Sequence, residues 1–149
     1  MQKSYLALGC FWKPEETFRQ ITGVIETEVG YAGGKSSNTN YDEVCTGKTG
    51  HTETVKIIYD EKIISYEKLL EVFFKIHDPT QKDMQYPDVG TQYRSEIFYE
   101  NELQKNIAEK YINLFNKKFN GKIETNISKI KNYCKAEEYH QKYIMKENQ

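Results

Sequence analysis

The chain has 149 residues, of which 38% are hydrophobic, and it carries 21 basic and 22 acidic side chains. This length suits a single domain over residues 1–149 that buries about two-thirds of the surface its unfolded form exposes. The formal net charge of −1 provides no field that would attract nucleic acid or an anionic lipid surface. We therefore expect no nucleic-acid partner and no membrane partner. A monomer is also expected.

Three cysteines are an odd number, and their spacing matches no paired zinc motif. Neither a disulfide framework nor a structural metal is expected, and reduced thiols in the cytoplasm fit better. Residues 6–10, Leu-Ala-Leu-Gly-Cys, are similar to the lipidation box of a bacterial lipoprotein. However, the residues before them are too few for the apolar stretch of about 7–15 residues that a signal peptide needs. No apolar run approaches the ~18 residues needed to cross a bilayer.

The first predicted element is a short buried strand over 4–8, and Gly9 marks the sharp exit from it. A helix is predicted over 11–21. The alternation of apolar and polar residues over 24–31 predicts a half-exposed strand. A loop then begins at Gly33 and continues through a polar run.

The middle of the chain repeats this order of strand and helix. Residues 52–59 form the next strand, and Ser65 is expected to cap a helix that ends near Ile76. The polar stretch 80–91 is longer than a simple connection, which makes it a candidate functional loop. Residues 93–99 form a third alternating strand.

The last part of the chain opens with Asn101 and Gln104, a pair that resembles a capping box at the start of a long helix. Another strand is predicted over 123–127. An irregular segment with Cys134 and a short helix over 136–144 follow. Strands and helices interleave, so we expect an α+β sandwich in which helices pack on one sheet.

Cys10 is the sharpest chemical signal. A strand, a glycine, a cysteine and a helix in that order place the thiol at a helix amino terminus, where free amides and the helix dipole favour the thiolate. Taken alone, a buried apolar cysteine is an equally good interpretation. Phe11 and Trp12 favour a nucleophile, because two adjacent large aromatics cannot both face the core and one should line an opening beside the thiol. Such an apolar wall suits a substrate with a methyl or thioether end.

Glu53 is the second signal. It shares the parity of Val55 and Ile57, which marks it as inward-facing on the strand 52–59. Burial would raise the pKa of this carboxyl and let it donate a proton near neutral pH. The alternative is a frayed strand end with a solvated Glu53. His51 has the same parity, but a histidine at a strand entrance is more often a hydrogen-bonded support.

Tyr41, Tyr93 and Asp88 are weaker candidates by themselves. The chain contains 12 tyrosines, most of which must be ordinary packing or surface residues. Arg94 and Asp88 could equally form a loop salt bridge of little consequence.

Five segments carry a family resemblance in order along the chain: 9–12 (Gly-Cys-Phe-Trp), 30–34 (Gly-Tyr-Ala-Gly-Gly), 41–53, 88–95 and 136–141 (Ala-Glu-Glu-Tyr-His-Gln). Together they resemble the A-type peptide methionine sulfoxide reductases, which are oxidoreductases that repair oxidised proteins. The resemblance covers nearly the whole chain. It implies a ferredoxin-like α+β core with long coils and no metal or organic cofactor. It also implies the S epimer of methionine sulfoxide, free or in peptides and proteins, as substrate.

The resemblance further implies roles for individual residues. Cys10 attacks the sulfoxide sulfur and becomes a sulfenic acid, while Glu53 protonates the departing oxygen. Tyr41 and Tyr93 assist through hydrogen bonds.

Substrate contacts are implied for three more residues. Phe11 and Trp12 cradle the S-methyl group, and Asp88 orders the substrate loop. The chain departs from the family where Lys13-Pro14 replaces the common Gly-Ala after the tryptophan.

Recycling of Cys10 is the second departure. Many members carry resolving cysteines in a glycine-rich tail, and the sequence ends at Gln149 without one. Either thioredoxin or another thiol reduces Cys10 directly, or Cys134 first forms an internal disulfide. We favour Cys134, since segment 136–141 packs close to the nucleophile in the family. Cys45 follows Tyr41 by one helical turn and is expected to be buried.

Two competing classes remain open at this point. A cysteine hydrolase or acyltransferase would need a histidine base near the thiol, and the candidates are His51, His77 and His140. A binding or redox-sensing module would dock methionine-containing peptides without turnover. Conversion of S and R methionine sulfoxide in the presence of dithiothreitol separates all three.

Overall fold

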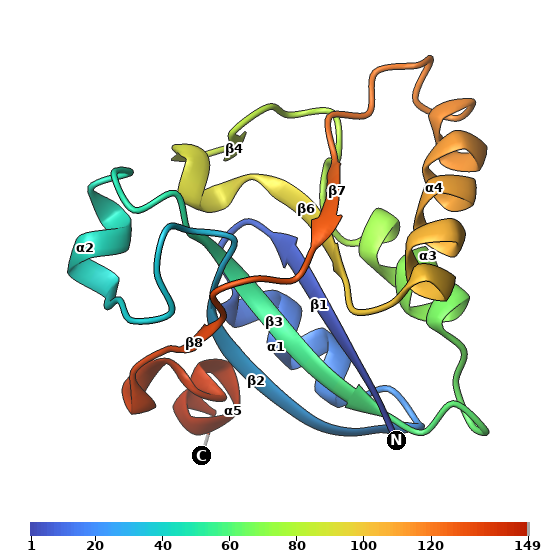
Figure 1. The fold of residues 1–149 in the computed structure, drawn as a ribbon. Helices are drawn as coiled ribbons and strands as arrows, with labels where there is room; N and C mark the ends of the chain where they lie inside the picture. The colour runs from blue at the N-terminus through green and yellow to red at the C-terminus, as the bar shows by residue number, and fades with distance from the viewer. Residues whose placement is uncertain (149) are drawn as a thin grey trace.

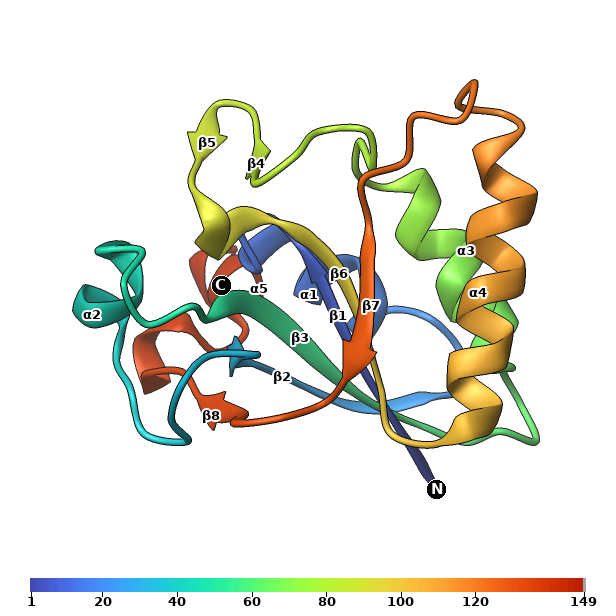
Figure 2. The same cartoon turned by 45° about the horizontal axis from the view of Figure 1, so that its top comes forward.

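The computed structural model describes residues 1–148 and is built on one six-stranded sheet (Figure 1). Its strands lie in the order β7-β6-β1-β3-β2-β8, and every neighbouring pair is antiparallel except β6 and β7. Their bounds are β1 Gln2–Leu8, β2 Val24–Ala32, β3 Thr52–Tyr59, β6 Ser95–Tyr99, β7 Asn126–Lys129 and β8 Cys134–Lys135. A small hairpin, β4 Met84–Gln85 and β5 Asp88–Val89, stands apart from the sheet (Figure 2).

The helices are α1 Trp12–Arg19, α2 Tyr41–Cys45, α3 Tyr66–Lys75, α4 Glu102–Asn116 and α5 Tyr143–Glu147. Helix α1 packs on β2 and β3, and α3 packs on β1 and against α4. Phe18 of α1 and Leu69 and Phe73 of α3 are fully buried in the same core cluster. Within residues 1–148, no helix has the length and apolar character that crossing a membrane requires.

The predicted α+β class is confirmed, since one sheet carries the packed helices. Elements β1, α1, β2, β3, α3 and β6 follow the β-α-β-β-α-β order of ferredoxin-like folds. The finer ferredoxin-like assignment stays a prediction. Strands β7 and β8 extend this set at its two edges.

The predicted caps form as the sequence indicates. The Ser65 side chain accepts a hydrogen bond from the amide of Lys68 at the start of α3, and Asn101 accepts one from the amide of Gln104 at the start of α4. The second half of the capping box is shifted by one residue. The Gln104 side chain accepts from the amide of Glu100 rather than from that of Asn101.

Helix α2 was missed by the sequence analysis, which treats this stretch as loop. Asn40 caps the helix by accepting a hydrogen bond from the Glu43 amide at 2.9 Å. A polar cap followed three residues later by glutamate was the signal that could have revealed it.

The carboxy-terminal predictions need two corrections. Cys134 is not in an irregular segment, because it pairs with Tyr31 as part of edge strand β8. Residues 136–144 do not form one helix either. Lys142 has a φ of 50° and interrupts it, because the Lys142 amide donates to the Glu15 carboxylate at 2.7 Å. Tertiary contacts to α1 therefore override the local helical pattern.

Candidate active site

Cys10 lies just beyond the end of β1, where the chain turns into α1. Gly9 makes the turn with a φ of 93°, and a Cβ there would lie 2.8 Å from the Gln85 Cβ. Glycine is thus required both by the backbone conformation and by the close approach of the β4–β5 hairpin. The Cys10 side chain is half-buried.

The protonation of Cys10 differs from the expectation. Burial raises the pKa of the Cys10 thiol to about 11, and the nearby carboxylates of Glu53 and Asp88 also raise it. The Trp12 amide at the start of α1 acts in the opposite direction. A single amide does not offset desolvation, so the expected bias toward thiolate is wrong for the protein without substrate.

Glu53 is buried at the end of β3, as the alternation of the strand predicts. Its side chain is 2% exposed, and its Oε1 accepts a hydrogen bond from the Phe11 amide at 3.2 Å. Burial raises the pKa of Glu53 to about 8, opposed by that amide and reinforced by Asp88. The carboxyl is consequently protonated at neutral pH, and it is hydrogen-bonded to the residue that follows Cys10. Its burial excludes the alternative of a frayed strand end with a solvated Glu53.

Tyr41 and Tyr93 bring two hydroxyl groups to the same site. Contact with the Cys45 thiol raises the pKa of Tyr41 to about 12, with burial and the Glu53 charge adding to the effect. Burial raises the pKa of Tyr93, and the Glu53 charge is the next cause. Both hydroxyls are hydrogen-bond donors at neutral pH, and the Glu53 charge contributes to the raised pKa of each.

The two aromatics after Cys10 differ in burial, although Trp12 does not line the cavity that contains Cys10. Phe11 is 1% exposed, whereas Trp12 is only half-buried. The Trp12 indole stacks on Tyr143 with ring centroids 3.8 Å apart, and its Nε1 donates to His140 Nδ1 at 3.0 Å. The carboxy-terminal segment thereby fixes the orientation of the indole.

Glu137 was quoted in the resemblance without a role of its own. Its carboxylate accepts hydrogen bonds from the Tyr31 hydroxyl and from the Tyr41 amide, each at 2.8 Å. Tyr31 is the neighbour of Glu53 across the β2–β3 pair. Glu137 therefore ties helix α2, which carries Tyr41, to the sheet that carries Glu53.

Asp88 lies on the β4–β5 hairpin and lines a cavity of about 360 Å³ together with Cys10. Other walls of this cavity come from Pro14 of α1 and Tyr86 of the hairpin. The proposed Arg94–Asp88 salt bridge is not the pairing in the structure. The Arg94 guanidinium pairs instead with Glu96 at 2.7 Å.

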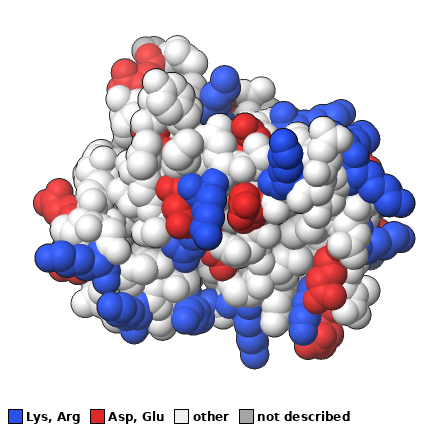
Figure 3. All heavy atoms as spheres, turned by 90° about the horizontal axis from the view of Figure 1, so that it is seen from above, with Lys and Arg blue, Asp and Glu red and all other residues white. Residues whose placement is uncertain are grey.

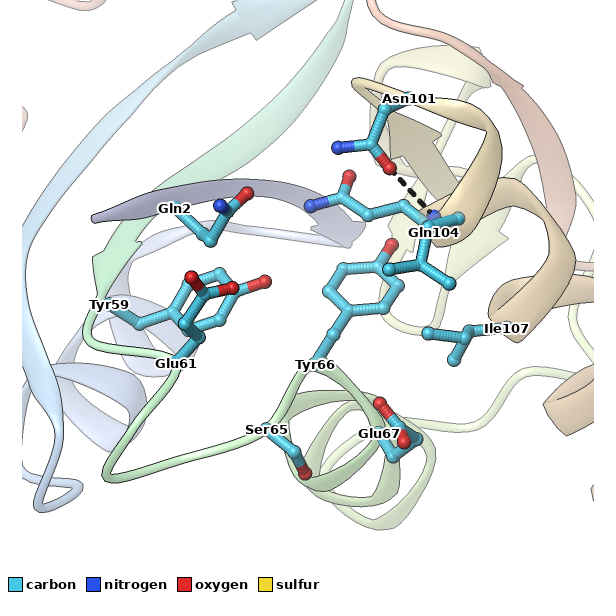
Figure 4. Close-up of a pocket in the computed structure, with 10 residues that line it drawn as sticks. Gln2, Tyr59, Glu61, Ser65, Tyr66, Glu67, Asn101, Gln104 and Ile107 are labelled. Atoms are coloured by element: carbon cyan, nitrogen blue, oxygen red, sulfur yellow. Dashed lines mark hydrogen bonds between the residues drawn. The ribbon is translucent and has the colours of Figure 1, made fainter.

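A slightly larger cavity, of about 390 Å³, lies elsewhere, between the start of α3 and the start of α4 (Figure 4). Tyr59, Tyr66 and Gln104 point into it. It contains none of the predicted site residues, so size alone would have misplaced the active site.

The three histidines do not act on the thiol through any hydrogen bond in residues 1–148. His51 bonds the Ser36 carbonyl, His77 bonds the Phe73 carbonyl and the Ser95 hydroxyl, and His140 accepts from Trp12. Burial lowers the pKa of all three imidazoles. Each imidazole thus has a hydrogen-bond partner other than the Cys10 thiol, although His77 lines the same cavity as Cys10, and this pairing disfavours a cysteine hydrolase.

The other two cysteines occupy different places. Cys45, expected to be buried, is half-buried and touches Tyr41. Cys134 is half-buried in β8, and its thiol donates to the Thr39 carbonyl at 3.5 Å. Among residues 1–148, no three His, Cys, Asp or Glu side chains are grouped so that they could hold a metal ion.

Charges of both signs are intermixed on the face seen from above in Figure 3. This agrees with the near-zero net charge of the sequence.

Comparison with known proteins agrees with this fold. The family described as peptide methionine sulfoxide reductase matches residues 2–149. A relative from Pelagibacter ubique, named peptide methionine sulfoxide reductase MsrA, is 57% identical over 146 residues, which cover 98% of this chain and 99% of the relative.

Two solved structures of Mxr1 from Saccharomyces cerevisiae are also similar. The reduced form has a TM-score of 0.94 at 39% identity, covering 99% of this chain and 86% of that one. Mxr1 in complex with Trx2 has a TM-score of 0.67 at 28% identity, covering 95% and 84%.

The fold and the matched family define an oxidoreductase. The chain belongs to the peptide methionine sulfoxide reductase family, as its motifs indicate.

Proposed function

We propose that this chain reduces the S epimer of methionine sulfoxide, free or in proteins, with Cys10 as nucleophile and Glu53 as general acid. The observation that carries the proposal is a buried carboxyl with a pKa of about 8 bound to the amide next to a thiol. A carboxylic acid that stays protonated at neutral pH supplies what a sulfoxide oxygen needs in order to leave.

The raised pKa values of Glu53 and Cys10 determine which group carries each proton before the reaction. Glu53 donates its proton to the sulfoxide oxygen as the Cys10 sulfur attacks the substrate sulfur. The thiol proton of Cys10 then restores Glu53. The bond formed between the two sulfurs and the substrate S–O bond both break as the oxygen passes to the Cys10 sulfur, so methionine leaves and a sulfenic acid stays. This route does not require thiolate before substrate binds, in accord with the raised pKa of Cys10.

The two tyrosines stabilise the oxygen during this step. Tyr41 and Tyr93 keep their protons because their pKa values are raised. Hydrogen-bond donors held at the site of developing charge lower the barrier without reorganisation.

The apolar wall selects the methyl end of the substrate. Trp12 is held by Tyr143 and His140, and Phe11 is fixed in the core. The methyl group packs on the half-exposed indole, and Asp88 orders the hairpin on the other side of the thiol.

The sulfenic acid is recycled by thiols. The yeast protein Mxr1 has been solved in complex with Trx2, which supports a thioredoxin-type reductant for this chain. We propose direct reduction of Cys10, because strands β3 and β2 separate β1 from β8. Three strand spacings of about 4.8 Å place Cys134 about 14 Å from the β1 line. A disulfide needs Cα atoms within about 7 Å, so the Cys134 route requires β8 to leave the sheet.

The chain is proposed to act as one domain over residues 1–149. Its three cysteines, an odd number, fit a reducing compartment such as the cytoplasm.

The test is turnover of separate S and R methionine sulfoxide with dithiothreitol, followed by methionine release. We expect conversion of S alone. Binding without methionine release would favour a docking module, and an acyl-enzyme burst with thioesters would favour a hydrolase.

A further inference from the structure

Helix α1 borders two cavities on its outer side. The first, of about 360 Å³, includes Cys10, Lys13 and Thr17 in its wall. The second, of about 370 Å³, includes Lys13, Thr17 and Gln20, together with Ile144 of α5. Lys13 and Thr17 line both, so the two cavities adjoin along the helix. We call this continuous surface, from Cys10 past Lys13 to Gln20, the α1 track.

We propose that the α1 track holds the peptide that flanks the oxidised methionine, and that Lys13 selects an acidic side chain in that peptide. The inference rests on the proposed function, because it takes the sulfoxide to be bound at Cys10.

The position of the thiol supports a peptide as the occupant. A methionine sulfoxide whose sulfur reaches Cys10 must have its backbone in open space continuous with the thiol, and the first cavity is such a space. From Lys13 to Gln20 the helix rises about 10 Å, at 1.5 Å per residue. An extended peptide covers that length with about three residues at ~3.3 Å each.

The apolar part of the track suits the residues between the sulfoxide and the acidic side chain. Pro14, Ile76 and Tyr86 line the first cavity, and Ile76 and Tyr86 are 37% and 76% exposed. Exposed apolar side chains beside a reactive thiol favour contact with a substrate chain.

The charges of the track single out Lys13. It is exposed and takes part in none of the salt bridges among residues 1–148. Glu16, farther along the track, is neutralised by Arg19 at 2.5 Å. Asp88 at the Cys10 end would repel a carboxylate next to the sulfoxide. Lys13 follows Cys10 by three residues, about 5 Å at 1.5 Å per residue. An extended peptide covers that length with one or two residues at ~3.3 Å each, so an acidic residue at such a position comes level with Lys13.

The experiment uses peptides with one S methionine sulfoxide and a single Glu, Gln or Lys placed one, two or three residues before or after it. The measured quantity is kcat/KM of the full chain at low and high salt. At low salt we expect the wild type to favour a Glu peptide over the matching Lys peptide by about two- to fivefold, the range of an exposed ion pair. Salt should reduce this preference.

Two variants with the same charge reversal make the test specific. Lys13→Glu is expected to invert the preference. Lys110→Glu, on exposed α4 away from the track, is expected to keep it. An unchanged preference in Lys13→Glu, or an equal loss for Glu and Lys peptides, overturns the proposal.

Binding of the fluorescently labelled peptides to Cys10→Ser separates this inference from the proposed function. Tighter binding of the Glu peptide that depends on Lys13 supports the track even if wild-type turnover of free methionine sulfoxide were absent. Equal binding of Glu and Lys peptides contradicts it even if turnover is normal.

Discussion

The backbone amide of Phe11 donates a hydrogen bond to the carboxyl of Glu53 at 3.2 Å. This contact joins the turn that carries Cys10 to the end of β3. It holds the proposed proton donor beside the proposed nucleophile, whereas burial of the carboxyl, which this contact opposes, raises the pKa of Glu53 to about 8.

The first reductive step should depend on Glu53 being protonated. With a pKa of about 8, the single-turnover rate should be level below that pH and fall above it. Glu53→Gln is expected to slow the step by about 10²–10⁴-fold and to abolish the fall. Stopped-flow measurement of methionine formation between about pH 6 and about pH 9 checks this. An unchanged rate or profile would make Glu53 a support.

Glu53 should also destabilise the fold as pH rises. Its folded pKa of about 8 lies above the ordinary value of 4.5, so folding favours the neutral form. That contribution is complete below pH 4.5 and is lost progressively as pH rises through about 8. Glu53→Gln has no such loss, so its Tm advantage over the wild type should grow from acidic to alkaline pH. A constant difference in Tm would contradict the raised pKa.

Glu137 is expected to hold Tyr41 in place. Glu137→Ala leaves the Tyr31 hydroxyl and the Tyr41 amide without their acceptor, which should cost about 1–3 kcal/mol of unfolding free energy for each group left unsatisfied. Glu138→Ala is the matched control, because Glu138 is exposed and pairs only with Lys135 at 3.5 Å. Denaturant unfolding compares the two. Equal effects would remove the special role of Glu137.

Direct recycling of Cys10 can be tested by counting thiols. The protein has three free cysteines, and one equivalent of sulfoxide without reductant should consume one of them, in the wild type and in Cys134→Ser alike. Loss of two thiols in the wild type but one in Cys134→Ser would show that β8 leaves the sheet to form the internal disulfide. Cys45→Ser in parallel identifies Cys45 if it is the partner instead.

Patterns of local sequence predicted the parts of the fold that depend on local physics. The inward parity of Glu53 and the caps at Ser65 and Asn101 are of this kind. Long-range contacts were not predictable. The pairing of Cys134 with Tyr31 and the break at Lys142 both depend on segments about 100 residues away or more.

The protonation of Cys10 shows the same limit. The helix start was visible in the sequence, but the burial of the thiol and its two carboxylate neighbours was not. The sequence pattern thus placed Cys10 at the start of the helix but gave the wrong direction for the pKa of its thiol.

The most direct test of the account is a mass measurement on Cys10 after one turnover. The wild type is mixed with one equivalent of S methionine sulfoxide and dimedone, and Cys10→Ser is treated in the same way. The account predicts one methionine released per protein and one dimedone adduct on Cys10, with neither in the variant. Methionine release by Cys10→Ser, or release by the wild type with the adduct on another residue, would contradict it.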